Sequence, residues 1–247
     1  MTTKLIMVTG ASADSDIGLA ICQQLAGDGY QLILVGRREE ALQATQAQIP
    51  GEHIIAPMDL TALDDINGWM KSLCSEHGKL SGLVHSASYQ GYSPLRGMKS
   101  KQIHQYFDTN VAAALMLTAA FSKPQHHTPP ASIVHIGSVA GFKGLKGRSL
   151  YAASKAALMS ITQSCALELA DKQIRVNCVA PALVDGAKAQ QQFAMLNPEQ
   201  QQALKDEHPL GLVPPQRVAQ AVAYLISDSA SHISGHTLPV DGGYLIA

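Results

Sequence analysis

Two side chains with complementary proton chemistry stand four residues apart in YAASK, residues 151–155. Tyr151 offers a phenol and Lys155 an ammonium, and because the segment is strongly helical, both should lie on one helix face. A nearby cation favours the phenolate and lowers a tyrosine pKa from its usual value of about 10. The spacing predicts that Tyr151 is a proton donor with a lowered pKa. The alternative is a packing tyrosine beside a solvated lysine.

A hydroxyl group precedes this pair by a short stretch of chain. Ser138 lies in HIGSVAG, directly after a β-branched run that should form a strand. Open α/β sheets bind ligands at the carboxyl ends of their strands, so Ser138 would stand at the binding edge. Ser138, Tyr151 and Lys155 could therefore meet in one cleft.

A second candidate site is TGASADSDIG, residues 9–18, where an apolar run meets a helical segment. The first N–H groups of a helix and its positive dipole end attract a pyrophosphate. Gly10 would permit the tight turn, Gly18 would permit close helix packing, and Ser12 and Ser15 could add hydroxyl donors. Asp16 would repel a phosphate, so we expect it to cap backbone donors at a helix start. The loop alone is equally compatible with a turn that binds no ligand.

The elements that must position these residues alternate along the chain between β-branched runs and helical stretches. The predicted strands are LIMVTG, QLILVG, HIIAPM, GLVHSA, SIVHIG and IRVNCVA, and the predicted helices are 17–26, 39–48, 63–77, 102–121 and 150–170. Residues 123–132 are expected to be a helix-to-strand loop. This rhythm predicts a doubly wound, Rossmann-type parallel β-sheet in three α/β/α layers, with residues 1–247 forming a single domain.

Composition narrows the classes of function. The formal net charge is −1, and no basic stripe is visible, so nucleic acid is not an expected partner. The longest apolar stretch, residues 111–121, is too short to span a membrane, and no export signal is visible. The four cysteines form no CxxC pair and suggest buried free thiols in a reducing cytoplasm, and no metal site is predicted.

In order and spacing, several short motifs resemble the short-chain dehydrogenase/reductases over essentially the whole chain. The matching stretches are TGASADSDIG, MDL, FDTNVAAAL, GSVAG, YAASK, RVNCVAPALV and SGHTLPVDGGYL. The pattern is closest to 3-oxoacyl-[acyl-carrier-protein] reductases. The resemblance implies an NAD(P)-dependent oxidoreductase that reduces a ketone to a secondary alcohol, with a 3-oxoacyl thioester as the leading substrate. The alternatives are a dehydrogenase of a sugar, polyol or steroid-like alcohol, and a nucleotide-binding regulator without turnover.

The resemblance also implies a catalytic tetrad. Tyr151 would protonate the substrate carbonyl oxygen, and Ser138 would hold that oxygen. Lys155 would hydrogen-bond the nicotinamide ribose and lower the tyrosine pKa, while Asn110 would support a water that relays protons to the lysine. Taken alone, Ser138 and Asn110 would be an ordinary turn serine and helix cap.

Cofactor contacts follow from the same resemblance. The implied set is Gly10, Ser12, Ser15, Asp16, Ile17, Gly18, Arg37, Arg38, Asp59, Leu60, Ser86, Ala87, Tyr151, Lys155, Pro181 and Val184. The sequence departs from the family at several of these positions, because the first loop is two residues longer, Asp16 replaces a glycine, and HSAS, residues 85–88, replaces NNAG.

The end of the second predicted strand bears on cofactor choice. Gly36 stands where an acidic side chain would bind the 2′-hydroxyl of NAD, and Arg37 follows it. A guanidinium can bind a 2′-phosphate bidentately, so the sequence favours NADP over NAD. The alternative is that Arg37 and Arg38 are solvated residues at a helix start.

Substrate and assembly are less constrained. Residues 185–210 are polar, glutamine-rich and helical in tendency, and they resemble the family's substrate lid. The residues that would line or pack near the opening are Tyr89, Gln90, Tyr92, Phe142 and Leu145. The cluster of Lys143, Lys146 and Arg148 could meet an anionic group such as a phosphopantetheine arm or could be a solvated loop. Family oligomers imply a homotetramer or homodimer built on residues 111–121, residues 156–169 and the chain's end.

Overall fold

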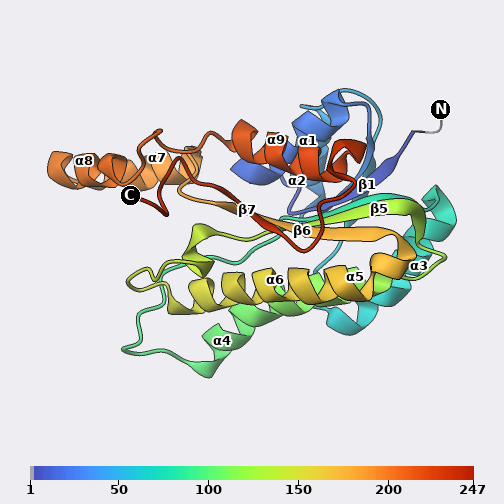
Figure 1. The fold of residues 1–247 in the computed structure, drawn as a ribbon, viewed down its shortest axis with the longest axis horizontal. Helices are drawn as coiled ribbons and strands as arrows, with labels where there is room; N and C mark the ends of the chain where they lie inside the picture. The colour runs from blue at the N-terminus through green and yellow to red at the C-terminus, as the bar shows by residue number, and fades with distance from the viewer. Residues whose placement is uncertain (1–2) are drawn as a thin grey trace.

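The computed structural model describes residues 3–247, which form a seven-stranded, all-parallel sheet between two layers of helices (Figure 1). Sheet order is β3-β2-β1-β4-β5-β6-β7. The strands are β1 Leu5–Thr9, β2 Gln31–Gly36, β3 Ile54–Pro57, β4 Leu80–His85, β5 His127–Ile136, β6 Ile174–Pro181 and β7 Thr237–Val240. The predicted fold class, a doubly wound three-layer α/β domain, is confirmed.

Helices cover both faces of this sheet. The α-helices are α1 Asp16–Gly27, α2 Glu39–Gln46, α3 Ile66–His77, α4 Ser100–Phe107, α5 Ala113–Phe121, α6 Ser149–Glu168, α7 Ala187–Ala194, α8 Pro198–Asp206 and α9 Pro215–Ile226. Short turns of other helix types are η1 Leu63–Asp65, η2 Asp108–Ala112, η3 Val139–Gly141, η4 Ala170–Lys172 and η5 Asp228–Ala230. One described helix, α6, reaches twenty residues, but none is long and apolar enough to cross a membrane.

The apolar strand runs are explained by burial on both sides. One core packs α1, α2 and α9 against residues such as Val8, Leu34 and Val134. The other packs α3, α5 and α6 against the alternate strand positions, among them Met7 and Ile133. Because successive strand side chains point to opposite faces, each strand contributes to both cores. This double cover leaves the strand ends as the place where polar side chains can collect.

Two predicted boundaries are wrong. The single helix predicted over residues 102–121 is divided into α4, the π-helical turn η2 and α5, and the turn contains Asn110. The loop predicted over residues 123–132 is also partly strand, because β5 already begins at His127. There Leu80 and His127 are register partners, and Pro129 and Pro130, which have no N–H, sit in the strand before the regular pairing resumes at Ser132.

Two elements were not anticipated at all. α9 begins at Pro215, a residue favoured in the first turn of a helix. Its apolar side, which includes Val218, Val222 and Leu225, is buried. β7 adds the edge of the sheet beside β6, with Cys178 paired to Thr237. Arg175 on β6 holds the end of α9 and the segment before β7 in place. Its guanidinium donates to the carbonyl oxygens of Leu225, at 2.7 Å, and of residues 226, 227 and 233.

Candidate active site

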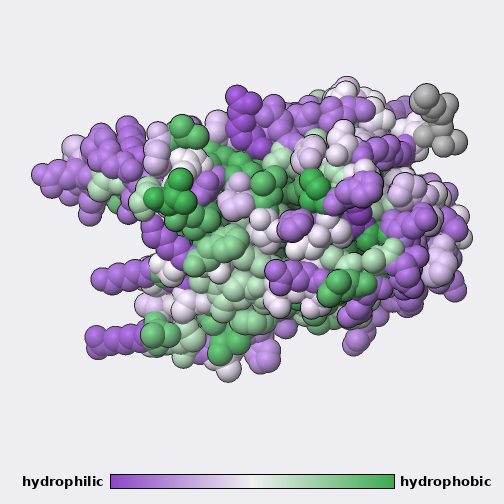
Figure 2. Space-filling model, in the orientation of Figure 1, coloured by the Kyte–Doolittle hydropathy of each residue, from purple (hydrophilic) through white to green (hydrophobic). Residues whose placement is uncertain are grey.

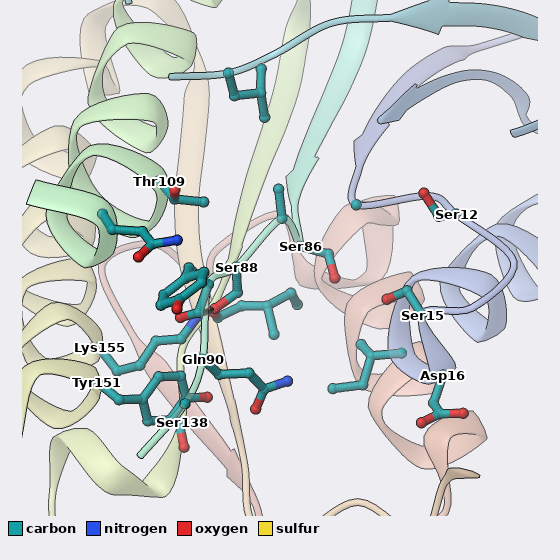
Figure 3. A pocket seen from close by; sticks show the side chains of 18 of the residues that line it. Ser12, Ser15, Asp16, Ser86, Ser88, Gln90, Thr109, Ser138, Tyr151 and Lys155 are labelled. Carbon is teal, nitrogen blue, oxygen red and sulfur yellow. Dashed lines mark hydrogen bonds between the residues drawn. The ribbon is translucent and has the colours of Figure 1, made fainter. Parts of the chain in front are cut away.

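A large pocket opens at the carboxyl edge of the sheet, with a volume of about 1080 Å³. It lies where the strand order reverses between β1 and β4, the position at which doubly wound sheets bind ligands. Figure 3 shows Ser138, Tyr151, Lys155 and Gln90 on one side of the pocket and Ser12, Ser15 and Asp16 on the other, with Ser86 between them. In Figure 2 the surface is hollowed at the end of the molecule from which α7 and α8 project.

Tyr151 and Ser138 converge from α6 and the start of η3. Ser138 follows β5, and its hydroxyl accepts a hydrogen bond from the Ala140 N–H at 3.2 Å, which fixes the turn. Burial raises the pKa of Tyr151, while a hydrogen bond with the Ser138 hydroxyl and the charge of Arg148 act in the opposite direction. The predicted lowering of the Tyr151 pKa is therefore wrong in this structure, because desolvation of the phenol outweighs its favourable neighbours.

Lys155 is buried almost completely, with 1% of its surface exposed. Its ammonium donates to the carbonyl oxygen of Ile136, the last residue of β5, at 2.7 Å, and lies 5.6 Å from the centre of the Tyr151 ring. Burial lowers the pKa of Lys155 to about 8. The lysine thus lies near the Tyr151 ring, as expected. Burial lowers the pKa of the lysine itself, and the pKa of the tyrosine is not lowered.

Asn110 organises the segment that follows β4. Its side-chain oxygen accepts from the Tyr89 N–H at 2.6 Å, and its amide donates to the Tyr89 carbonyl and to the Ser154 hydroxyl, both at 2.9 Å. Both amide protons are therefore used inside the protein. The side chain is fully buried and is not among the residues that line the pocket, so these contacts show Asn110 positioning Tyr89. Its water-supporting role stays a prediction.

The first loop is built for close backbone approach. Gly10 has a φ of +67°, and a Cβ there would lie 2.7 Å from the Ala87 nitrogen on the neighbouring strand end. A Cβ on Gly18 would overlap the Gly10 carbonyl oxygen. Ser15 is the N-cap of α1 and accepts from the Gly18 N–H at 3.2 Å. The first N–H groups of α1, at Asp16 and Ile17, consequently face the pocket edge without intrahelical acceptors.

Asp16 caps a helix start, but not that of its own helix. Its carboxylate accepts from the Ala187 N–H at 3.2 Å, at the first residue of α7. A Cβ on Gly186 would overlap this carboxylate, so glycine is required beside it. The side chain is thereby turned from the α1 N-terminus toward the predicted lid, which could not be foreseen because the partner lies far away in sequence.

The end of β2 is crowded at the position where NAD recognition uses an acidic side chain. A Cβ on Gly36 would already lie 3.0 Å from the Ser12 hydroxyl. Arg38 pairs with Asp14 at 2.6 Å, whereas Arg37 is exposed and lines the pocket. This arrangement leaves one guanidinium available at the pocket's rim.

Most of the predicted site residues line this one pocket. Within residues 3–247, the predicted residues that do not line it are Gly18, Asn110, Phe142, Lys143, Leu145 and Lys146. Lys143 lies instead over the Tyr244 ring, 4.4 Å from its centre. Other residues on α4, on η2 and in the predicted lid also line the pocket and were not predicted from the sequence, among them Lys101, His104, Thr109, Gln191 and Met195. Only Tyr106 is buried on α4, so no pattern of buried and exposed positions marked Lys101 and His104 as pocket residues.

The fold and the pocket together define a class, the doubly wound nucleotide-dependent enzymes. A family model described as enoyl-(acyl carrier protein) reductase matches residues 10–245. A 3-oxoacyl-[acyl-carrier-protein] reductase from Rickettsia conorii is 33% identical over 247 residues, which cover 100% of this chain and 98% of that protein. A cyclopentanol dehydrogenase from Comamonas sp. is 31% identical over 245 residues, 98% of this chain and 96% of that protein.

Among solved structures, the ligand-free aldohexose dehydrogenase of Thermoplasma acidophilum superposes with a TM-score of 0.85 at 27% identity, covering 99% of this chain and 95% of that one. The chain belongs to the short-chain dehydrogenase/reductase family. It is therefore an oxidoreductase acting on CH–OH groups, and its family uses NAD(P). The glycine cradle at Gly10 and Gly18 and the capped start of α1 fit the pyrophosphate of such a dinucleotide.

Gly18→Ala tests the cradle. The added methyl group would overlap the Gly10 carbonyl oxygen, so we expect weaker NADPH binding and a loss of unfolding free energy of about 1–3 kcal/mol. Gly27→Ala, in the same helix with open space around it, is the control and should be neutral or stabilising. Fluorescence titration with NADPH and urea unfolding measure both effects. Equal behaviour of the two variants would contradict the packing account.

The buried ammonium of Lys155 should make stability depend on pH. Because its folded pKa is about 8 and an unfolded lysine titrates near 10.4, the cost of burying the charge is fully present below pH 8 and fades as pH rises. Lys155→Met should therefore gain stability over the wild type at pH 7.5, and that difference should fall by about 3 kcal/mol by pH 10.5. Lys146→Met, at an exposed position, is the control. A pH-independent difference would refute the depressed pKa.

Proposed function

We propose that this protein is an NADPH-dependent reductase that converts a ketone to a secondary alcohol, with 3-oxoacyl compounds, first of all thioesters, as substrates. The observation that carries the proposal is the convergence of Ser138, Tyr151 and Lys155 on the pocket that also receives the N-terminus of α1. Hydroxyl donors for a carbonyl oxygen and a pyrophosphate cradle thus share one cavity.

On the dinucleotide side, the chain's role is to bind and orient. The N-terminus of α1 and the hydroxyls of Ser12 and Ser15 would hold the pyrophosphate. Asp59 and Leu60 would flank the adenine, and the Asp59 carboxylate is already oriented by the Thr61 N–H at 3.0 Å. The remaining implied contacts, Ser86, Ala87, Pro181 and Val184, line the same pocket. Bound NADPH supplies the hydride.

On the substrate side, Tyr151 and Ser138 would handle the carbonyl oxygen. The raised pKa keeps Tyr151 protonated at neutral pH, so it can donate a hydrogen bond to the carbonyl and transfer its proton as negative charge develops on the oxygen. Ser138 would donate a second hydrogen bond to the same oxygen. Lys155, held by Ile136, would orient the nicotinamide ribose, and Asn110 would hold the wall at Tyr89 and support the proton-relay water.

The preference for NADP over NAD is supported by charge and space at the end of β2. Gly36 provides no carboxylate for a 2′-hydroxyl, a side chain there would crowd Ser12 and Leu42, and Arg37 is available for a 2′-phosphate. Arg38 would add charge nearby while it remains paired with Asp14.

Relatives support two substrate classes. The 3-oxoacyl reductase relative favours 3-oxoacyl thioesters. The cyclopentanol and aldohexose dehydrogenases favour the alternative, oxidation of a cyclic or sugar alcohol. A panel of both classes assayed with NADPH and NADP separates them, and NADPH binding without any turnover would favour a nucleotide-binding regulator.

Lid and assembly complete the proposal. We expect α7 and α8 to close over the substrate, because Gln191 and Met195 line the pocket from this segment.

Exposed apolar side chains on α5 and α6, Leu115 at 42% and Leu167 at 83%, support a homotetramer or homodimer through these helices. The free thiols are consistent with a reducing compartment, for which we propose the cytoplasm.

Tyr151→Phe tests the proton donor. Removing the hydroxyl should lower kcat at least about 100-fold with any accepted ketone, because general acid catalysis is lost. NADPH affinity, measured by fluorescence titration, should remain within a few-fold of the wild-type value. Full activity in the variant would assign the proton to another group.

Arg37→Asp tests the cofactor preference. Replacing a guanidinium by a carboxylate should lower kcat/KM for NADPH by about 10- to 100-fold relative to NADH, since charge-assisted hydrogen bonds to a phosphate are lost. Arg217→Asp, on the first turn of α9 and outside the pocket lining, is the matched control. An unchanged NADPH to NADH ratio would show that Arg37 does not contact the 2′-phosphate.

A further inference from the structure

Arg148 stands beside the reacting groups without having a place in the reaction described so far. It is the N-cap residue of α6 and lines the pocket, half-buried, three residues before Tyr151. Its charge helps to lower the pKa of the Tyr151 phenol, so the guanidinium acts on the proton donor from within the same pocket.

Hydrogen bonds to the backbone of residues 91–93 hold Arg148 and the residue before it in place. One guanidinium N–H donates to the Gly91 carbonyl oxygen at 3.1 Å. The same two segments are joined by the Ser93 N–H, which donates to the Gly147 carbonyl oxygen at 2.7 Å. Gly147 has a φ of +72°, and a Cβ there would overlap the Tyr92 ring, so the two segments are closely packed. One of its donors holds the arginine in place, and its other N–H groups form no hydrogen bond with the described residues.

No carboxylate neutralises this guanidinium in the described chain. The ion pairs within residues 3–247 join Lys4 to Asp228, Arg38 to Asp14 and His77 to Glu76. The acidic side chains that line the pocket are Asp14, Asp16, Asp59 and Asp108. The first three belong to the dinucleotide half, and Asp108 begins η2. Among the described residues Arg148 therefore has no ion-pair partner.

Two further observations place that charge toward the substrate. Arg148 acts to lower the pKa of both Tyr151 and Tyr106, so its charge reaches the phenols of α6 and α4. Gln90, one residue before the carbonyl that holds Arg148, lies near Ser138 and Tyr151 in Figure 3, and its amide extends into the open pocket. An amide and a guanidinium beside a proton donor form a donor set suited to a carboxylate.

We propose that Arg148, assisted by the Gln90 amide, binds a carboxylate on the substrate, so that the enzyme prefers short oxo acids; this inference rests on the function proposed above. Arg148 precedes Tyr151 by only three residues and lines the same pocket, so the carbonyl and the carboxylate of the substrate are separated by only a few carbon atoms. The inference keeps the ketone reduction proposed above but replaces the thioester named there with the free 3-oxo acid, because a thioester has no charged carboxylate.

The carboxylate takes no part in the chemistry. The carbonyl carbon gains the hydride of NADPH, its oxygen gains the Tyr151 proton, and NADP and a hydroxy acid are formed. Solvent returns a proton to the phenolate, which balances the reaction. Arg148 is accordingly a specificity residue whose effect should appear mainly in KM, because it binds ground state and transition state alike.

The test compares acids with neutral analogues that carry the same carbonyl. Wild type, Arg148→Gln, Arg148→Lys and the control Lys146→Gln are assayed with NADPH and 2-, 3- and 4-oxopentanoate and their methyl esters. We expect at least one acid to exceed its ester in kcat/KM by about 10- to 100-fold. Arg148→Gln should abolish this ratio, Arg148→Lys should keep much of it, and Lys146→Gln, at an exposed position outside the pocket lining, should not change it.

A purely structural role for Arg148 predicts a different result, because loosening the Gly91 segment would slow acid and ester alike and leave their ratio unchanged. That result, or the absence of any acid preference in the wild type, would overturn the proposal. Calorimetry of pentanoate and pentanamide with the NADPH complex gives a readout that needs no turnover. Pentanoate binding that Arg148→Gln abolishes would support the carboxylate site even if none of the ketones were reduced, an outcome that would contradict only the proposed reaction.

Discussion

The reversal of strand order between β1 and β4 is the constraint on which the site depends. Crossovers from these neighbouring strands pack on opposite faces of the sheet, so their ends separate and leave a cavity at the carboxyl edge. At this edge the first loop packs closely on its neighbours, because Gly10 lies directly against the Ala87 backbone and Gly18 lies against Gly10. One end of the cavity thereby receives the start of α1 and the other receives the start of α6.

Burial controls the protonation of the groups at this edge more than pairwise attraction does. Desolvation raises the pKa of Tyr151 and lowers that of Lys155, so the phenol keeps its proton at neutral pH. Below them, burial also lowers the pKa of His85 and lowers that of His135 to about 4, so both imidazoles are neutral. His135 is held between the hydroxyls of Thr118 and Thr162. The two neutral histidines and the threonine hydroxyls therefore form a polar but uncharged layer near the buried Lys155.

Local patterns in the sequence were sufficient for β1 to β6, the glycine cradle and the grouping of Ser138, Tyr151 and Lys155, because period and spacing determine which face a side chain takes. They were insufficient wherever a distant partner decides. The contact of Asp16 with α7 spans 171 positions, and the break in the helix predicted over 102–121 occurs where Asn110 binds Tyr89. The shifted pKa values likewise follow from three-dimensional burial, which no spacing rule contains.

The most direct test of the account is the fate of the cofactor hydrogen. A reducible ketone is incubated with the enzyme and NADPH deuterated at either face of C4, and the alcohol is analysed by mass spectrometry. A single fixed pocket predicts that deuterium from one face only appears on the carbinol carbon. An alcohol without deuterium from either face, formed while NADPH is bound, would contradict hydride transfer in this pocket.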